Sequence, residues 1–380
     1  MSAKCLATAL TSETGEDYFR HVQWSADGTC LLAVTASNSI YTYVVPPDLM
    51  DEREQPLDLS VYCKITSNDP VNALTGYPHF DLTDPQTTLV LSARRDLPIK
   101  LNSALTGQLG ASYPLINPMT EAYICPNSLT FNSIGDRFIA GSESLISTFD
   151  LSRPGQEPIS AIPTGPRRRG DSHHNPAINM RGLISTLAIE PSTHVLAAGT
   201  FNRSIGLYES MGDGECIGVF SVKGNSADAA IRGSGVTQVS WSPCGRYLYI
   251  AERKSDGLHL YDIRKTGQLL TWLEGRNSVT NQRMSFDIFP TDQEGGHEVW
   301  AGGIDGKLRV WRNPHHSEGP MPPSSEFDAH NDVVSTAAIH KTGTVIATTS
   351  GQRHFPDLGG EETVGDGNAR DGSLKLWAVD

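Results

Sequence analysis

The stretch VVSTAAIH (Val333–His340) is the first of three consecutive predicted strands at the end of the chain, followed by TVIATTS (Thr344–Ser350) and SLKLWAVD (Ser373–Asp380). These three strands are one short of a four-stranded unit that recurs through the sequence. The other end of the chain offers KCLATAL (Lys4–Leu10), an alternating apolar stretch without a local partner. We expect this first strand to complete the last unit, because a ring closed in this way leaves no exposed sheet edge. The two ends therefore predict a closed β-propeller.

The recurring unit begins with two strands joined by a turn that is rich in Pro, Asp and Gly, residues that favour tight turns. Its six clear copies are QWSADGTCLLAV, TFNSIGDRFIAG, AIEPSTHVLAAG, SWSPCGRYLYIA, DIFPTDQEGGHEVWAGG and AIHKTGTVIATTS. A third strand follows, with an aromatic residue near its end. The equivalent positions are Tyr43, Phe149, Tyr208, Tyr261, Trp311 and Trp377, with Asn102 in a divergent second copy.

The repeats predict an all-β fold, a seven-bladed β-propeller that spans residues 1–380 as a single domain, with residues 4–10 in the last blade. The expected blades are Phe19–Ser67, Asp69–Leu115, Ala122–Ile162, Gly182–Lys223, Gly235–Glu274, Gln282–Asn313 and Val333–Asp380. Dipeptides such as Tyr261–Asp262 and Phe149–Asp150, and the segment Asp328–Ala329–His330, resemble elements of the WD-repeat family.

The overall composition constrains the class of partner and the compartment. The formal net charge is −13, so a site for a polyanion must be a local basic patch on an acidic protein. The six cysteines are far apart and never form C-x-x-C, which favours reduced thiols over disulfides or a zinc site. No apolar run approaches the roughly 18 residues of a membrane span, and the N-terminus lacks a secretory pattern. We expect a nuclear protein, with the cytoplasm as a second compartment, and no membrane partner.

In a four-stranded blade, the turn between the second and third strands and the connection to the next blade open on one face, which we call the rim face. The other two turns open on the opposite face. Most long loops are expected on the rim face: Gly107–Glu121, Pro163–Arg181, Gly224–Ser234, Pro314–Asn331 and Gly351–Gly372. Loops on a rigid scaffold often carry function, although surface loops also simply tolerate insertions.

Basic residues gather in these rim-face loops. The turns between second and third strands supply Arg94, Arg95, Arg203, Arg253, Lys254 and Arg353, and the blade connections add Arg167, Arg168, Arg169, Arg181, Arg232, Asn277, Asn281, Gln282 and Arg283. Arginine presents a planar fork that suits phosphate and stacks on bases. Nearby aromatic residues could stack on unpaired bases: Tyr77, Phe80, Tyr113, Tyr123 and Phe355. The alternative is that each arginine pairs with a neighbouring carboxylate such as Asp96, Glu252 or Asp256.

Sequence motifs for catalysis are absent. The sequence contains no P-loop, dinucleotide fingerprint, H-E-x-x-H motif or G-x-S-x-G nucleophile elbow. We therefore expect a protein that is not an enzyme and that uses no cofactor or metal.

Three segments carry a closer resemblance: TTLVLSARRDLPIKLNSALTGQLGASY (Thr87–Tyr113), VTNQRMSFDIFP (Val279–Pro290) and VIATTSGQRHFPD (Val345–Asp357). They are similar to the telomerase Cajal-body WD-repeat proteins and their fungal relatives, in the same order along nearly the whole chain. The loop 163–180 departs from that pattern. The resemblance implies a protein that binds small Cajal-body RNA, or telomerase RNA in animals, through a short single-stranded motif, and that escorts the ribonucleoprotein to its nuclear site.

The first hypothesis is thus a monomeric propeller that binds small nuclear or telomerase RNA, together with the proteins of its ribonucleoprotein, on the rim face. Its predicted RNA-binding residues are Arg94, Arg95, Arg203, Arg253, Lys254, Asn281, Gln282, Arg283, Gln352 and Arg353. The alternative is a protein-interaction scaffold in which the same face binds an acidic peptide and no RNA. The RNA hypothesis predicts steep salt dependence, because neutralised phosphates release counterions.

Overall fold

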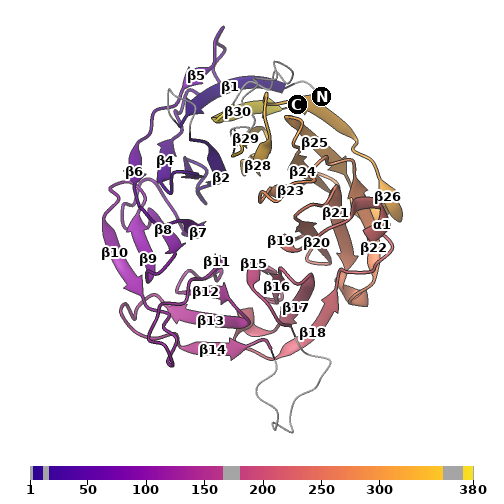
Figure 1. The fold of residues 1–380 in the computed structure, drawn as a ribbon. Coiled ribbons are helices and arrows are strands. Elements are labelled where there is room, and N and C mark those ends of the chain that lie inside the picture. The colour runs from indigo at the N-terminus through magenta and orange to yellow at the C-terminus, as the bar shows by residue number, and fades with distance from the viewer. Residues whose placement is uncertain (1–2, 12–16, 166–179, 354–370, 380) are drawn as a thin grey trace, which may run out of the picture.

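The computed structural model describes residues 3–11, 17–165, 180–353 and 371–379. Within these ranges the strands form seven sheets arranged in a ring, with the first strand of each repeat nearest the ring axis (Figure 1). This arrangement confirms the predicted seven-bladed β-propeller. Among the same residues, no helix has the length and apolar character needed to span a membrane.

The first four blades follow one another along the chain. Blade 1 contains β2 (Phe19–Trp24), β3 (Cys30–Thr35), β4 (Ile40–Val44) and β6 (Cys63–Ile65). Blade 2 contains β7 (Val71–Gly76), β8 (Leu89–Arg94), β9 (Ile99–Ser103) and β10 (Leu109–Tyr113). Blade 3 contains β11 (Ser128–Phe131), β12 (Arg137–Ser142), β13 (Leu145–Asp150) and β14 (Ser160–Pro163). Blade 4 contains β15 (Ile184–Ile189), β16 (Leu196–Thr200), β17 (Ser204–Tyr208) and β18 (Cys216–Ser221).

Two of the last three blades, blades 5 and 7, include strands from elsewhere in the chain. Blade 5 contains β19 (Val236–Trp241), β20 (Tyr247–Glu252), β21 (Gly257–Asp262), β22 (Leu269–Glu274) and the added β26 (Gly319–Met321). Blade 6 contains β23 (Phe286–Pro290), β24 (His297–Gly302), β25 (Lys307–Arg312) and β27 (Ser325–Asp328). Blade 7 contains β28 (Val334–Ile339), β29 (Val345–Ser350), β30 (Ser373–Val379), β1 (Ala3–Leu10) and β5 (Leu57–Asp58). The short helix α1 (Asp228–Ile231) precedes blade 5.

The ring closes as the sequence predicts, because β1 pairs antiparallel with β30 in a register that runs from Ala3 opposite Val379 to Leu10 opposite Ser373. Ala7 and Ala9 are buried in the same hydrophobic cluster as Leu374 and Leu376. The N-terminal strand therefore covers an edge of β30 that would otherwise expose unpaired backbone groups.

Blade 7 contains a buried hydrogen-bond network that begins at the segment Asp328–Ala329–His330. His330 contacts the Ser373 hydroxyl through Nδ1 at 3.2 Å and the Thr348 hydroxyl through Nε2 at 2.7 Å. The indole N–H of Trp377 donates to the same Thr348 oxygen at 2.8 Å. Asp371 accepts from the Ser373 hydroxyl, and its Oδ2 lies 3.2 Å from His330 Nδ1. Burial would raise the pKa of the Asp371 carboxyl, but the contacts with His330 and Ser373 lower it below its ordinary value. The aromatic end of the third strand is thus fixed by hydrogen bonds as well as by packing.

The aromatic position predicted in each third strand lies in the core. Its members are all buried: Tyr43, Phe149, Tyr208, Tyr261, Trp311 and Trp377. Asn102, the divergent member, is also buried and donates from Nδ2 to the main-chain oxygen of Gly107 at 3.1 Å. The Asn102 amide thus provides a hydrogen-bond donor for a turn carbonyl at the position where the other blades have an aromatic ring.

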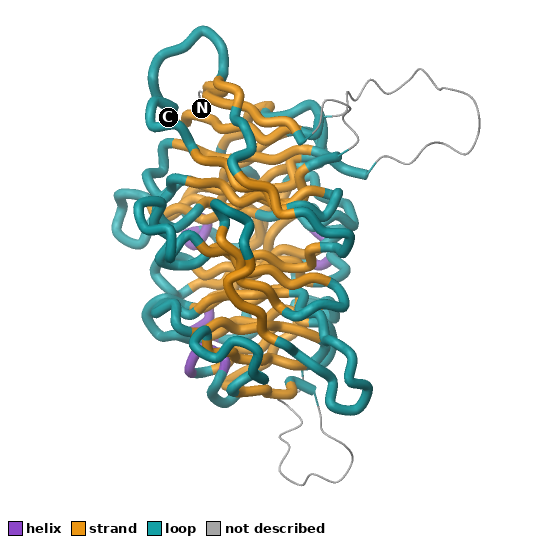
Figure 2. Tube along the Cα trace, turned by 90° about the vertical axis from the view of Figure 1, so that its left-hand side faces the viewer, coloured by secondary structure: helices purple, strands orange, loops and turns teal. Residues whose placement is uncertain are grey.

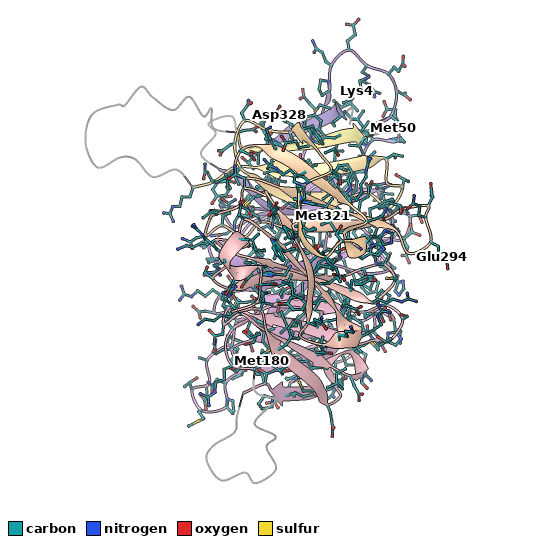
Figure 3. The ribbon with its side chains drawn as sticks, turned by 90° about the vertical axis from the view of Figure 1, so that its right-hand side faces the viewer. Lys4, Met50, Met180, Glu294, Met321 and Asp328 are labelled. Atoms are coloured by element: carbon teal, nitrogen blue, oxygen red, sulfur yellow. The ribbon has the colours of Figure 1, made fainter. Side chains whose placement is uncertain are left out.

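Two of the expected rim-face loops contain strands instead. The range Gly107–Glu121 includes β10, and Pro314–Asn331 includes β26 and β27, so the predicted end of blade 6 at Asn313 was wrong. The segment is rich in proline and glycine, which favour turns, so its two short strands were not predicted. Figure 3 shows Met50 and Glu294 on one face of the ring and Asp328 on the other, and Figure 2 shows loops on both sides of the strand layer. Long loops are therefore shared between the faces, including the 45–56 segment before β5.

Candidate nucleic-acid interface

Arg283 bridges inner strands from two other blades at the rim face. It directly precedes blade 6, and its Nε donates to the Thr237 main-chain oxygen at 3.1 Å. Its Nη2 donates to Thr237 oxygen at 2.7 Å and to Ser185 oxygen at 2.6 Å. Thr237 lies on β19 and Ser185 on β15, two of the strands nearest the ring axis (Figure 1). The guanidinium is enclosed by protein yet retains exposed surface, as expected of a side chain that projects toward the axis.

Other cations face Arg283 from different blades. Burial lowers the pKa of Arg283 to about 10, and the charges of Arg20 and Arg253 lower it further in the same direction. Burial likewise lowers the pKa of His21 to about 4, with repulsion from Arg283 and Arg20 as the second and third causes. The charged groups that shift these two residues are all cations. Because neighbouring positive charges repel one another, the binding of an anion between them would be favourable.

Arg253 reaches this region from the end of β20. Its guanidinium carbon lies 3.9 Å from the ring centroid of Phe201, a cation–π contact. The buried Nε of Arg253 has no hydrogen-bond partner among the described residues, and burial lowers the pKa of the guanidinium. A buried N–H without an acceptor is costly, so a ligand oxygen at this position would be stabilising.

Arg353 completes the group beside Tyr18. Burial raises the pKa of the half-buried Tyr18 phenol, while the positive charges of Arg20 and Arg353 act in the opposite direction. Tyr18 is thus close to both arginines. We call the five basic residues the axial cluster: Arg20, His21, Arg253, Arg283 and Arg353.

Two of the recognised segments contact each other next to this cluster. Gln282 donates from Nε2 to the main-chain oxygen of Gly351 at 2.9 Å, and Gln352 donates from Nε2 to Asp332 Oδ1 at 2.9 Å. Both amides are therefore engaged within the protein. Asn281 is exposed, so its amide is accessible to a ligand.

Arg203 forms ion pairs within the protein, whereas its motif predicts a side chain that is available to RNA. Its Nε donates to Glu252 Oε1 at 2.7 Å and its Nη2 to Glu252 Oε2 at 2.7 Å, while its Nη1 and Nη2 also contact Asp228 of α1. Glu252 is fully buried and contacts His259 at 3.3 Å. The carboxylates raise the pKa of Arg203 above its ordinary value in spite of burial. The guanidinium is occupied by these carboxylates and anchors α1 to blades 4 and 5.

Three further predicted residues differ from one another in exposure. Arg94 is only 5% exposed, and its Nε and Nη2 have no hydrogen-bond partner in the described part of the chain. Its pKa is lowered by burial, against the opposing charge of Asp69. Arg95 is exposed and lies 3.9 Å from the Asp96 carboxylate, and Lys254 is exposed on the turn after Arg253.

The predicted stacking residues do not gather at the rim. Phe80 and Tyr113 are core residues, and Tyr77 packs against Phe131 at a centroid distance of 5.5 Å. Tyr123 is exposed. Phe355 and the arginines Arg167, Arg168 and Arg169 lie outside the described residues.

Arg20, His21 and Tyr18 were not among the residues predicted from the sequence. They lie at the start of β2 or just before it, where two adjacent basic residues interrupt an inner strand. The pairing register shifts between Phe19 and His21, and a bulge of this kind often re-aims side chains near functional sites. The two adjacent basic residues in an inner strand were the feature of the sequence from which this part of the site could have been predicted.

The chain is similar to several characterised proteins, although no family model matches it. It is 29% identical to "Telomerase Cajal body protein 1" of Mus musculus over 350 residues, which is 91% of this chain and 61% of that protein. The human protein of the same name is also 29% identical, over 90% of this chain and 58% of its own length. The chain thus spans about three fifths of these relatives.

A fungal protein is more similar in sequence over a shorter stretch. "Guanine nucleotide-binding protein negative regulator 1" of Schizosaccharomyces pombe is 32% identical over 301 residues, which is 78% of this chain and 71% of that protein. This coverage includes most of both chains, and the seven-bladed ring agrees with it. The chain therefore belongs to the WD-repeat family that contains the telomerase Cajal body proteins and their fungal relative.

Proposed function

We propose that this protein is a non-enzymatic RNA-binding propeller whose axial cluster binds small nuclear, Cajal-body-type or telomerase RNA. In doing so it helps to assemble or localise the ribonucleoprotein in the nucleus. The observation that carries the proposal is the convergence of Arg20 and Arg253 on Arg283, which retains exposed surface and whose pKa these two positive charges lower in addition to burial. An RNA phosphate placed between these arginines would relieve the repulsion on Arg283. The names of the relatives, which refer to telomerase and to the Cajal body, support the choice of RNA and the nuclear location.

Residues of the axial cluster and residues beside it would make different kinds of contact with the RNA. Arg20, Arg253 and Arg283 would contact phosphate oxygens, which supply most of the affinity and little of the specificity. The exposed amide of Asn281 would hydrogen-bond to a base edge, and Tyr18 would stack on an unpaired base. A single-stranded segment fits this arrangement best, because its bases are free to turn toward the protein.

Several predicted residues take supporting roles in this proposal. Gln282 and Gln352 hold the segments that carry Arg283 and Arg353, since their own donors are engaged within the protein. Arg203 anchors α1 and does not reach the RNA, because carboxylates occupy its guanidinium. Arg94, Arg95 and Lys254 remain candidates for additional RNA contacts on the rim face.

The test is crosslinking and sequencing of RNA bound to the full chain in cells, with wild type compared to the double variant Arg20→Gln/Arg253→Gln. Arg264→Gln is the matched control, because this exposed arginine pairs with Asp262 on the opposite face. We expect one class of small nuclear RNA to be enriched by wild type and the control, and to be lost from the double variant.

Enrichment that the double variant retains would contradict the axial site. No enrichment in any form would overturn RNA binding and favour an acidic peptide at the same cluster. That second outcome is checked by purifying partners before and after ribonuclease treatment: proteins that persist and depend on Arg20 and Arg253 would identify a protein ligand.

A further inference from the structure

A small cavity lies on the opposite face, at the seam between blades 3 and 4. Its volume is about 210 Å³. One wall is the turn between β11 and β12, with Ile134, Asp136 and Arg137, and the other is the connection after β17, with Met211 and Asp213. Both connections belong to the turns that open away from the axial cluster. The cavity is therefore independent of the proposed RNA site.

The size of the cavity restricts what it can hold. Pockets that enclose a drug-sized molecule or a cofactor have volumes of roughly 300–1,000 Å³. A space of about 210 Å³ is smaller than this range and suits a single extended side chain. Ile134 stands at the wall with 65% of its surface exposed, and Met211 lies opposite on the other connection. These apolar groups would contact the aliphatic stem of a long side chain.

Unpaired polar atoms line the same space. The Thr148 side chain is 2% exposed, and its Oγ1 has no hydrogen-bond partner among the described residues. The Oδ1 atom of Asp213 is also buried without a partner in that part of the chain. Because buried polar groups are nearly always hydrogen-bonded, two unpaired acceptors at one cavity point to a missing donor.

The charge of the cavity selects the kind of donor. Asp213 Oδ2 contacts Arg137 Nη1 at 3.5 Å, a long and partly exposed ion pair. Asp136 accepts from Asn132 Nδ2 at 2.6 Å through one of its two carboxylate oxygens. The lining thus carries two carboxylates and one guanidinium, and the excess negative charge favours a cationic group.

We propose that this cavity binds one basic side chain, an arginine or a lysine, presented by a protein partner. The aliphatic stem would lie against Ile134 and Met211, and the cation would donate to Asp213 Oδ1 and the Thr148 hydroxyl. The inference does not depend on RNA binding. It gives the propeller a protein-docking site on the opposite face from the axial cluster.

The test is a saturation-transfer NMR titration of the full chain with N-acetyl-arginine amide and with N-acetyl-citrulline amide, its uncharged counterpart. We expect the arginine probe to bind with a dissociation constant in the millimolar range and the citrulline probe to bind at least tenfold more weakly. Asp213→Asn and Thr148→Val should each weaken arginine binding, by tenfold or more for Asp213→Asn. Asp262→Asn, which changes a carboxylate elsewhere on the same face, should leave it unchanged.

Equal binding of the two probes would overturn the proposal. So would a folded Asp213→Asn variant that binds the arginine probe within twofold of wild type. If Asp213→Asn lowers the melting temperature strongly, Thr148→Val provides the decision, since it removes the other proposed acceptor and leaves the ion pair between Asp213 and Arg137 in place. The N-acetyl-lysine amide probe then shows which of the two cations is preferred.

Discussion

Gln282 donates a hydrogen bond from Nε2 to the main-chain oxygen of Gly351 at 2.9 Å, and this bond joins two segments that are 69 residues apart. Each segment continues directly into a basic residue of the axial cluster, Arg283 after Gln282 and Arg353 two positions after Gly351. The bond therefore fixes the relative positions of cations from blades 6 and 7. Pre-organised charges bind an anion more tightly than charges that must first be ordered.

Gln282→Leu should weaken RNA binding while leaving the fold intact. The variant removes one hydrogen bond with a net value of about 1 kcal/mol, so the melting temperature should fall by only a few degrees. The affinity for single-stranded RNA, measured by fluorescence anisotropy, should fall several-fold because the two segments lose their link. Gln268→Leu, on the opposite face, is the matched control. Unchanged affinity in Gln282→Leu would mean that other contacts hold these segments.

Arg203→Ala should act on stability. The substitution leaves the fully buried Glu252 without its charge partner, and removal of one member of a buried ion pair costs about 3–5 kcal/mol. Arg264→Ala, which breaks an exposed pair, should cost less than about 1 kcal/mol. Denaturant unfolding of both variants measures the difference. If Arg203→Ala is as stable as wild type but loses RNA, the role of Arg203 as an anchor is wrong.

The fold could be predicted because repeats carry redundant information. Most blades have the same turn and the same aromatic position, so a strand that is ambiguous in one copy can be assigned by comparison with the others. Blade 6 is the exception, since the segment after Asn313 first crosses to blade 5 as β26 and then returns as β27. Nothing in a local pattern of prolines and glycines indicates which blade a three-residue strand will join.

The site was harder to predict because it depends on contacts across the ring. Arg253, Arg283 and Arg353 could be predicted as candidates from their loops, whereas Arg20 and His21 lie in an inner strand and approach Arg283 only once the ring has closed. Arg203 was assigned to the RNA because its loop has the same pattern as the others. Its partners Asp228 and Glu252 are 25 and 49 residues away in sequence, so the pattern of the turn could not reveal them.

The closing strand β1 offers a test with two neighbouring positions. Ala7 is buried against the last blade, whereas Lys4 is exposed on the same strand (Figure 3). Ala7→Asp should destabilise the protein by several kcal/mol, because it buries an unpaired carboxylate, while Lys4→Asp should have little effect. Deletion of residues 1–10 should expose the edge of β30 and cause oligomerisation. Size-exclusion chromatography with light scattering measures this, and a stable monomer after deletion would contradict closure by β1.

Salt dependence separates phosphate contacts from other contributions to RNA affinity. For single-stranded RNA, the slope of log K against log salt concentration changes by about 0.7 for each phosphate that the protein neutralises. Arg20→Gln and Arg253→Gln should each reduce the slope by about this amount, and Asn281→Ala should reduce affinity without a change in slope. Anisotropy titrations between low and physiological salt provide the values. A wild-type affinity that is independent of salt would contradict phosphate binding at the axial cluster.

The pH dependence of RNA binding tests His21. In the free protein, burial and the charges of Arg283 and Arg20 lower the pKa of His21 to about 4, below its ordinary value of 6.5. The unfolded chain therefore binds more protons than the folded protein between these values, and this residue makes stability fall as the pH falls from 6.5 toward 4. A phosphate placed between the cations reverses their effect and raises the pKa of His21 in the complex. Binding then takes up protons, so affinity should rise as the pH falls from 7.5 to 5.5.

The matched variant is His21→Gln, which keeps a polar side chain of similar length and cannot titrate. Its affinity should change less with pH than that of wild type when both are measured by anisotropy at constant ionic strength. A proton taken up at one site can change the affinity by at most tenfold per pH unit, which limits the size of the effect. If wild type and His21→Gln show the same pH profile, the phosphate does not lie beside His21, and the axial position of the RNA is wrong.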